Sequence, residues 1–420
     1  MSHPLDTVRI KGLEYLKACF GEAAVERAVE MTARLEIEVP AWQFWAGFGG
    51  GGRFEGAGGG AAARNTAEIA ADAAVVHSLT RSTPAVGVHV LWSLSADGVN
   101  GDFETARRVA EEFRSRGLRL GSISPTYFLD GSQDGSLSAR DGKTRERYVE
   151  QTILAARVAA ELAGGVVSLW FPDGTNYPGQ RGLGEKLSLL ADSLKETWKR
   201  TPQAVREKLD RVLVEYKLFE PGTYSTTVPD WGVSRELARI FGDKGAVLID
   251  LGHHHHGTNV EQIVAALIAF GVRGGFHFNT RYAADDDHSV EANYEIARIF
   301  GELVAGGALL SGDPRRDWSL ALDQMARAEA RIPSVLKSVD ALKRSFARAM
   351  LLDMERLEAA RCGPDPLDAN IEYERALLHT DTAPLVLESY HRQGLHPDPL
   401  IAFRESGIQK KLERERAAKA

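Results

Sequence analysis

Short runs of apolar and β-branched residues alternate with helical patterns between about residues 37 and 325. This alternation is the signature of repeated βα units and of a parallel sheet. The predicted strands are IEVPAW near 37–42, AVGVHVLW at 85–92, RLGSISP at 119–125, VVSLWFP at 166–172, RVLVEYKLFE at 211–220, AVLIDLG at 246–252, RGGFHFN at 273–279 and WSLALDQ at 318–324. Eight strands with intervening helices predict an α/β fold, a (β/α)8 TIM barrel.

The segments that flank the barrel look helical. We predict an N-terminal helical segment over 1–36, the barrel over 37–332 and an α-helical C-terminal extension over 333–420, where charged helical stretches are interrupted by CGPDPLD and HPDPL. The helix after the sixth strand is the clearest, because Asn259 suits an N-cap and Gln262 stands three residues further on.

Composition and charge narrow the class of protein. With 44% hydrophobic and 26% charged residues, the chain is an ordinary globular protein. A net charge of -7 argues against nucleic acid as a partner. The two cysteines, Cys19 and Cys362, are too few for a disulfide framework, and a reducing compartment fits best. The N-terminus has no secretion signal and no apolar run is long enough to span a bilayer, so we expect a cytoplasmic protein without a membrane partner.

Imidazoles and carboxylates gather at the predicted ends of the sixth and seventh strands. LIDLGHHHHGTN carries Asp250 and His253, and GGFHFNTRYAADDDH carries His277, Asp285 and Asp287. Closely packed carboxylates repel one another and raise each other's pKa unless a cation compensates them. The pattern therefore predicts a metal-dependent enzyme.

Other polar residues obey the same rule, since active sites of this fold lie at the C-terminal ends of strands. Glu215 and Lys217 lie late in the fifth predicted strand, two apart and so on one face, and Asp323 closes the eighth. His89, late in the second strand, and Trp170, late in the fourth, complete the ring. Two divalent cations would balance the acidic excess, and oxygen and imidazole ligands favour manganese, cobalt, zinc or magnesium.

The motifs VEYK at 214–217, DLGH at 250–253, GGFHFN at 274–279 and DDD at 285–287 resemble those of the xylose-isomerase-like barrels, in particular the L-rhamnose isomerases of the Pseudomonas and Bacillus type. The similarity extends from about Trp42 to Asp323 and includes WQFWAGFGGGGRFEGAGGGAAAR and LWFPDGTNYPGQ. It implies an aldose–ketose isomerase that interconverts L-rhamnose and L-rhamnulose. It also implies two divalent ions per subunit, with Mn2+ the first choice and Co2+, Zn2+ or Mg2+ as alternatives. The subunits are expected to form a homotetramer, and the expected ligand is a small-molecule sugar.

The resemblance also implies a role for each matching residue. The first, structural metal is held by Glu215, Asp250, His277 and Asp323. The second, catalytic metal is held by His253, Asp285 and Asp287, with Asp250 bridging the two. The residues expected to act in catalysis are Lys217, His253 and Asp323. The residues expected to contact the sugar are His89, Trp170, Trp45 and Phe54, of which Phe54 reaches a neighbouring subunit's site. The run His253–His256 departs from the family's pattern, and only His253 has the ligand spacing, three residues after Asp250.

The chemistry leaves alternatives open. An aldose and its ketose differ by a hydrogen moved between C1 and C2, and two cations can polarise both sugar oxygens while that hydrogen moves as a hydride or as a proton through an enediol. A related isomerase with another preferred sugar, a sugar epimerase or a metal-dependent phosphodiesterase of the same superfamily, and a non-catalytic metal-stabilised sugar-binding scaffold are the competing hypotheses. The barrel alone does not choose among them.

Overall fold

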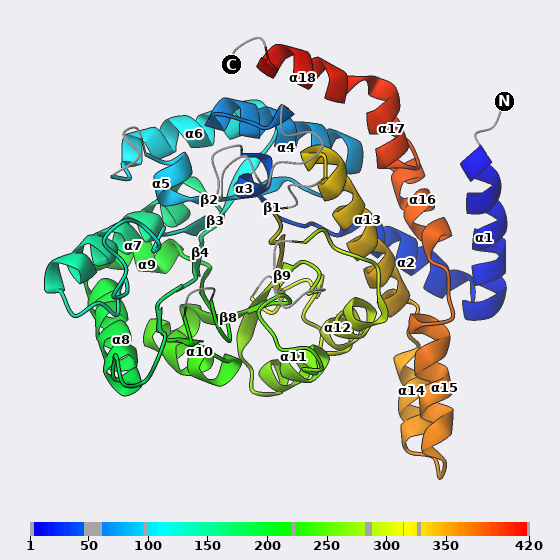
Figure 1. Cartoon of the computed structure of the whole chain (residues 1–420). Helices are drawn as coiled ribbons and strands as arrows, with labels where there is room; N and C mark the ends of the chain where they lie inside the picture. Colours follow the sequence, from blue (N-terminus) through cyan, green and yellow to red (C-terminus); the bar gives the residue numbers. More distant parts are fainter. Residues whose placement is uncertain are drawn as a thin grey trace.

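An eight-stranded parallel sheet, closed into a barrel, forms the centre of the molecule (Figure 1). The computed structural model describes residues 4–45, 61–95, 100–220, 223–281, 288–313, 315–325 and 329–417. The strands, in their order around the barrel, are β1 (Val39–Pro40), β2 (Ala85–His89), β3 (Arg119–Ser124), β4 (Val166–Leu169), β6 (Arg211–Glu215), β8 (Gly245–Asp250), β9 (Arg273–Phe278) and β10 (Ser319–Leu322). The predicted (β/α)8 barrel is confirmed.

Glu38 closes the barrel between its first and last strands. The Glu38 amide donates to the carbonyl of Leu320 at 2.8 Å, and the Leu322 amide donates to the Glu38 carbonyl at 2.9 Å. A barrel closed in this way leaves no sheet edge exposed.

Helices surround the barrel on its outer side (Figure 1). Those that follow the strands are α4 (Thr66–Thr80), α6 (Phe103–Ser115), α7 (Gly142–Leu162), α8 (Leu183–Arg200), α10 (Trp231–Ala238), α11 (Val260–Ala269), α12 (Tyr294–Ala305) and α13 (Arg331–Met350). Shorter elements stand between them: α3 (Ala41–Phe44), α5 (Val90–Ser93), α9 (Gln203–Lys208), a 3-10 helix (Arg239–Lys244) and the antiparallel pair β5 (Gly174–Thr175) and β7 (Ser225–Thr226).

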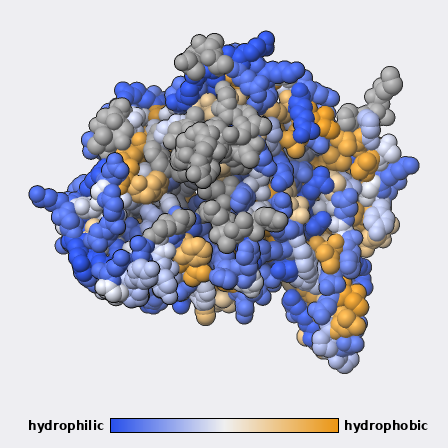
Figure 2. Space-filling model, viewed as in Figure 1, coloured by the Kyte–Doolittle hydropathy of each residue, from blue (hydrophilic) through white to orange (hydrophobic). Residues whose placement is uncertain are grey.

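The two ends of the chain lie side by side on one flank of the barrel (Figure 1). They comprise α1 (Pro4–Phe20) and α2 (Glu22–Arg34) at the N-terminus, and α14 (Met354–Arg361), α15 (Pro366–Leu377), α16 (Ala383–Arg392), α17 (Pro399–Ser406) and α18 (Ile408–Ala417) at the C-terminus. Helix α16 packs against α1 and α2, whereas the α14–α15 pair projects from the body. Figure 2 shows apolar residues on this projection, where Leu367 and Ile371 are exposed.

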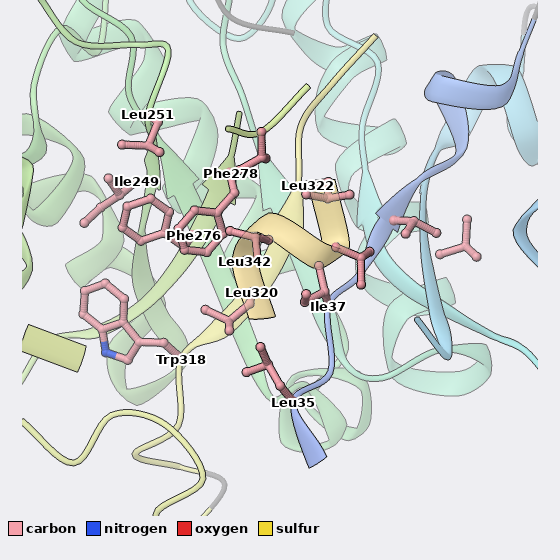
Figure 3. Packing of buried hydrophobic residues seen from close by; sticks show 14 of the residues in the cluster. Leu35, Ile37, Ile249, Leu251, Phe276, Phe278, Trp318, Leu320, Leu322 and Leu342 are labelled. Atoms are coloured by element: carbon pink, nitrogen blue, oxygen red, sulfur yellow. The ribbon is translucent and has the colours of Figure 1, made fainter. Parts of the chain in front are cut away.

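The main core lies between the outer face of the barrel and the helices. Figure 3 shows Phe276 and Phe278 of β9 near Leu342 of α13. The rings of Phe276 and Phe278 stack with centroids 4.3 Å apart, and Phe278 stacks on Phe300 of α12 at 5.3 Å. Because side chains alternate along a strand, the neighbouring residues of β9 face the barrel interior.

The structure confirms one predicted helix in detail and shortens several predicted strands. Helix α3 begins at Ala41, inside the strand predicted over 37–42, and β4 ends at Leu169, before the end of the strand predicted over 166–172. The side chain of Asn259 accepts a hydrogen bond from the Gln262 amide at 2.9 Å, so it caps α11. The prediction of a strand over 85–92 was too long, because β2 ends at His89 and the chain turns into α5. The prediction over 211–220 was also too long: β6 ends at Glu215, and the amide of Lys217 bonds the carbonyl of Val228 instead of a neighbouring strand.

Lys343 of α13 is a buried lysine outside the barrel mouth. Its Nζ donates to Ser82 Oγ at 2.8 Å and lies 4.3 Å from the ring centroid of Tyr390. Burial lowers the pKa of Lys343 to about 7, although Asp340 opposes this effect. Below that pH the lysine is charged in both the folded and the unfolded chain. From about pH 7 up to its ordinary value, the unfolded chain keeps a proton that the folded protein has lost, so folding stability from this residue rises with pH.

We predict that Lys343→Met is more stable than the wild type at pH 6, by about 1–3 kcal/mol, because it removes a buried charge. The advantage shrinks at pH 9, where the folded wild type holds the lysine neutral. Urea unfolding at both pH values measures the difference. Lys337→Met, at a partly exposed lysine of the same helix, is the control. A difference between variant and wild type that is the same at both pH values contradicts the lowered pKa.

Candidate metal centre

Four potential metal ligands meet at the C-terminal end of the barrel. Glu215 and Asp250 are the last residues of β6 and β8, His277 is the penultimate residue of β9, and Asp323 follows β10 directly. The register pairs Asp250 with His277, which brings their side chains to one level of the barrel. Potential ligand atoms of all four residues lie within 4.8 Å of one another. The first-metal residues named in the sequence analysis are thus neighbours in space.

The imidazole of His277 faces all three carboxylates. Its Nδ1 lies 3.4 Å from Glu215 Oε1, 3.4 Å from Asp323 Oδ2 and 3.7 Å from Asp250 Oδ2. Burial alone lowers the pKa of His277, but the charges of Glu215 and Asp323 outweigh it and raise that pKa well above its ordinary value. Three carboxylates this close together favour a positive charge among them.

A divalent cation fits this donor set. Glu215 Oε1 and His277 Nδ1 are buried and, despite their short separation, neither makes a hydrogen bond of acceptable geometry within the described part of the chain. Buried polar atoms without a hydrogen bond need a partner from outside the protein chain. Three carboxylates and one imidazole, without a thiolate, suit manganese, magnesium, cobalt or zinc. A bound cation would compensate the carboxylates and leave His277 neutral.

Neighbouring groups orient two of the carboxylates. The side-chain amide of Asn279 donates to Asp250 at 2.9 and 3.1 Å, and the Gly252 amide donates to Asp250 Oδ1 at 2.7 Å. Trp42 Nε1 donates to Asp323 Oδ1 at 2.9 Å. Partners of this kind fix the direction of ligand lone pairs and raise metal affinity.

His253 lies against the same cluster. Its Nδ1 is 3.0 Å from the carbonyl oxygen of Tyr216 and 3.3 Å from Glu215 Oε1, and its Nε2 is 3.9 Å from Asp250 Oδ1. A proton on Nδ1, held by the Tyr216 carbonyl, turns the basic Nε2 toward Asp250. That tautomer suits a ligand of a second ion. The other expected ligands of that ion, Asp285 and Asp287, lie outside the described residues.

The histidine run divides into buried and exposed members. His254 is buried, its Nε2 lies 2.7 Å from the hydroxyl oxygen of Tyr216, and burial lowers the pKa of His254 to about 4. His255 and His256 are exposed. His254 therefore braces the strand end behind the cluster as a neutral ring, and the exposed pair stands away from it.

Lys217 lies beside an aromatic wall. Its Nζ is 2.8 Å from Glu220 Oε2 and 5.7 Å from the ring centroid of Trp170. The Trp170 ring lies 5.5 Å from that of Phe128, and Phe128 lies 5.7 Å from the imidazole of His89. Glu220 forms an ion pair with the lysine, while the aromatic rings provide flat apolar surfaces next to it.

His89 connects this wall to the metal cluster. Its ring lies 5.1 Å from that of Trp42, in an edge-to-face arrangement. Burial lowers the pKa of His89 to about 4, so the ring is neutral. Trp45 follows α3 at the same end of the barrel and is partly buried. The position of Phe54 lies outside the described residues.

Sequence reasoning assigned no role to Trp42, Asn279 or Phe128. Two of them carried a usable signal. Asn279 stands two residues after His277, which is the spacing for one face of an extended chain. Trp42 ends the first predicted strand, where barrel enzymes carry functional residues. Phe128 lies in a loop and carried no such signal.

The fold and the cluster define a (β/α)8-barrel protein with a candidate divalent-metal centre at the carboxyl end of its strands. Comparison with known proteins gives the family: residues 23–364 match the model of L-rhamnose isomerase (RhaA), and the chain belongs to this family.

Relatives in the curated collections agree with this assignment. A probable sugar isomerase of Mesorhizobium japonicum is 31% identical over 431 residues, which cover 98% of this chain and 95% of the relative. An L-rhamnose isomerase of Bacteroides thetaiotaomicron is 25% identical over 75% of each chain. A solved structure described as L-ribulose 3-epimerase aligns with 82% of this chain and 98% of its own chain, at 15% identity and a TM-score of 0.47. The protein is thus a sugar isomerase.

We predict that a chelator lowers the melting temperature of the wild type and has little effect on Glu215→Gln. A metal that binds only the folded state stabilises it by mass action, by about 2.7 kcal/mol at a free concentration 100 times Kd. Thermal unfolding with Mn2+ and with EDTA measures the effect, and Glu196→Gln, an exposed site on α8, is the control. A wild-type melting temperature that is equal in Mn2+ and EDTA excludes a metal at this cluster.

We predict that Trp42→Phe weakens Mn2+ binding by about 10- to 100-fold, as losses of ligand-orienting hydrogen bonds do. The phenyl ring keeps the shape but loses the N–H that holds Asp323. Titration of the metal-free protein with Mn2+ gives the Kd. Trp198→Phe, in a ring that packs on Phe241 outside the barrel, is the control. An unchanged Kd for Trp42→Phe means that the indole does not orient the ligand.

Proposed function

We propose that the protein is a metal-dependent aldose–ketose isomerase that interconverts L-rhamnose and L-rhamnulose by a metal-assisted hydrogen shift between C1 and C2. The observation that carries this proposal is the cluster of Glu215, Asp250, His277 and Asp323 at the carboxyl end of the barrel. Membership in the L-rhamnose isomerase family supports the choice of sugar.

Two ions per subunit complete the proposed site, with Mn2+ the first choice. Glu215, Asp250, His277 and Asp323 hold the first ion, and His253 with Asp285 and Asp287 holds the second, with Asp250 shared. Bound divalent ions act as Lewis acids on the sugar's oxygens. The contact of His253 Nδ1 with the Tyr216 carbonyl, which leaves Nε2 on the side of Asp250, and the orientation of Asp250 by Asn279 support these assignments.

The protein's own groups bind the sugar and balance its charge. The ammonium of Lys217 stabilises negative charge that develops on a sugar oxygen, because a preorganised cation acts strongly in a site shielded from water. Trp170, Trp45 and Phe54 pack against the sugar's carbons, including the methyl group of a 6-deoxy sugar. His89, as a neutral imidazole, offers a hydrogen bond to the sugar without adding a positive charge beside the metal.

The proposal extends to assembly and compartment. We propose a homotetramer, which the exposed Leu367 and Ile371 of the projecting α15 support as a surface for another subunit. We also propose a cytoplasmic location, which the free and exposed thiols of Cys19 and Cys362 support. Within the described residues, helices of the length and apolarity needed to cross a membrane are absent.

The test of the proposed function is isomerisation by chelator-treated protein, with and without added Mn2+, of L-rhamnose beside D-xylose and D-allose. We expect activity that returns with Mn2+ and is highest on L-rhamnose. Activity highest on another sugar keeps the isomerase and overturns the substrate. Bound Mn2+ without isomerisation of any of the three sugars overturns the proposed reaction on them.

We predict that His253→Ala loses at least about 100-fold in kcat while its thermal stability in Mn2+ stays near that of the wild type, because the first ion keeps its ligands. His256→Ala, an exposed member of the same run, is the matched control and retains activity. Wild-type turnover in His253→Ala removes this residue from the catalytic site.

A further inference from the structure

The last turn of α18 carries a buried arginine. Arg416 is 4% exposed, and its guanidinium pairs in bidentate fashion with Asp72 of α4 at 2.7 and 2.8 Å. Asp72 is 1% exposed. Arg414, two residues earlier in the same helix, is exposed. Helix α18 also packs Ile408 and Leu412 against the core, but its charged anchor is this buried ion pair.

The same arginine also holds the chain just before α4. Its Nη1 donates to the carbonyl oxygen of Ala61, and its Nε lies 3.5 Å from Glu68 Oε2. In return, Arg64 Nη2 donates to the carbonyl oxygen of Arg416 at 2.6 Å. The contact is reciprocal, since each segment supplies a guanidinium to a carbonyl of the other.

The segment held by Arg416 leads to the barrel mouth. The Ala63 amide donates to the Phe44 carbonyl at 2.8 Å, and Ala63 forms a parallel β-bridge with Trp45. Phe44 and Trp45 end the short helix α3, whose Trp42 donates to Asp323 of the metal cluster. Backbone and side-chain hydrogen bonds thus run from the C-terminal helix to the two tryptophans at the mouth.

Energetics favour a specific role for this ion pair. Taking two charges out of water costs several kcal/mol per ion, and an apolar pair is often as stable or more so. Removal of one partner leaves an uncompensated buried charge, so Asp72 accepts α18 in only one docked position. Such a pair fixes the position of the two helices precisely but contributes little to stability. A residue that contacts a sugar, as proposed for Trp45, needs a precisely fixed position.

We propose that Arg416 is a positioning residue for the sugar-facing side of the site: it fixes Ala61–Ala63 and, through them, Trp45. This inference rests on the proposed function in one respect, namely that Trp45 contacts the sugar. Two further anchors of α3 lie elsewhere, because Gln43 Nε2 donates to Ser334 Oγ at 2.9 Å and to the Arg331 carbonyl at 3.2 Å. Arg416 therefore acts mainly on sugar binding and little on the metal.

The test compares Arg416→Ala, Arg416→Lys and Asp72→Asn with Arg414→Ala as the matched control. In Arg416→Ala we expect KM for the sugar to rise by about five- to tenfold with kcat within about twofold, since small displacements of positioning groups are costly. Arg416→Lys falls between this variant and the wild type. Asp72→Asn gives a smaller rise, because Arg416 keeps its bond to the Ala61 carbonyl. The double variant Arg416→Ala with Asp72→Asn adds little to Arg416→Ala, because the pairing with Asp72 is already lost there.

Hydrogen exchange at the Ala63 amide is measured in the same variants and needs no sugar. We expect it to be at least about tenfold faster in Arg416→Ala and unchanged in Arg414→Ala, because the amide's bond to Phe44 loses its support. Faster exchange confined to 408–417, with exchange at Ala63 and KM unchanged, overturns the positioning role and leaves only a helix anchor. If Arg416→Ala does not fold, Arg416→Lys decides on the same two readouts. If the wild type isomerises no sugar, the proposed function is wrong. Hydrogen exchange at the Ala63 amide then still tests whether Arg416 positions Ala61–Ala63.

Discussion

Mutual repulsion of Glu215, Asp250 and Asp323 is the constraint on which the rest of the structure depends. The three carboxylates converge on His277 Nδ1 at 3.4 to 3.7 Å, and Glu215 and Asp250 are buried, so that solvent screens their charges little. Only a positive charge makes this arrangement tenable. The ligand-bearing strands β6, β8, β9 and β10 are neighbours in the sheet. Trp42, which orients Asp323, follows β1 on the other side of the closure, so the backbone bonds of Glu38 hold this group next to the cluster.

The site depends on α3 as much as on the strands. This one-turn helix directs Trp42 to Asp323 and holds Gln43 against the start of α13. It is followed directly by Trp45, which pairs with Ala63. Segments that are far apart in sequence therefore share one small scaffold. A shift of α3 would move a proposed metal-orienting group and a proposed sugar-contacting group together.

The strands and the metal cluster were predictable from local pattern, whereas the groups that orient the cluster were not. Strand ends concentrate Asp250 and His277 within short motifs, and alternation puts them on the inner face. Lys217 was expected inside a strand, but β6 stops at Glu215 and the chain beyond it bonds to Val228. The hydrogen bond from Trp42 to Asp323 joins residues 281 positions apart in the sequence, and the periodicity of apolar residues cannot predict a contact between such distant residues.

The histidine run shows how one composition can hold different physical roles. His253 lies against Glu215 and Asp250, and His254 turns away to the hydroxyl of Tyr216. Four identical residues in a row cannot be assigned different roles from sequence, since every histidine offers the same ligand atoms. Backbone direction separates them, because the chain leaves β8 in a turn that buries the first two rings and exposes the next two. Ligand identity in such a run is therefore a property of the strand end and not of the residue type.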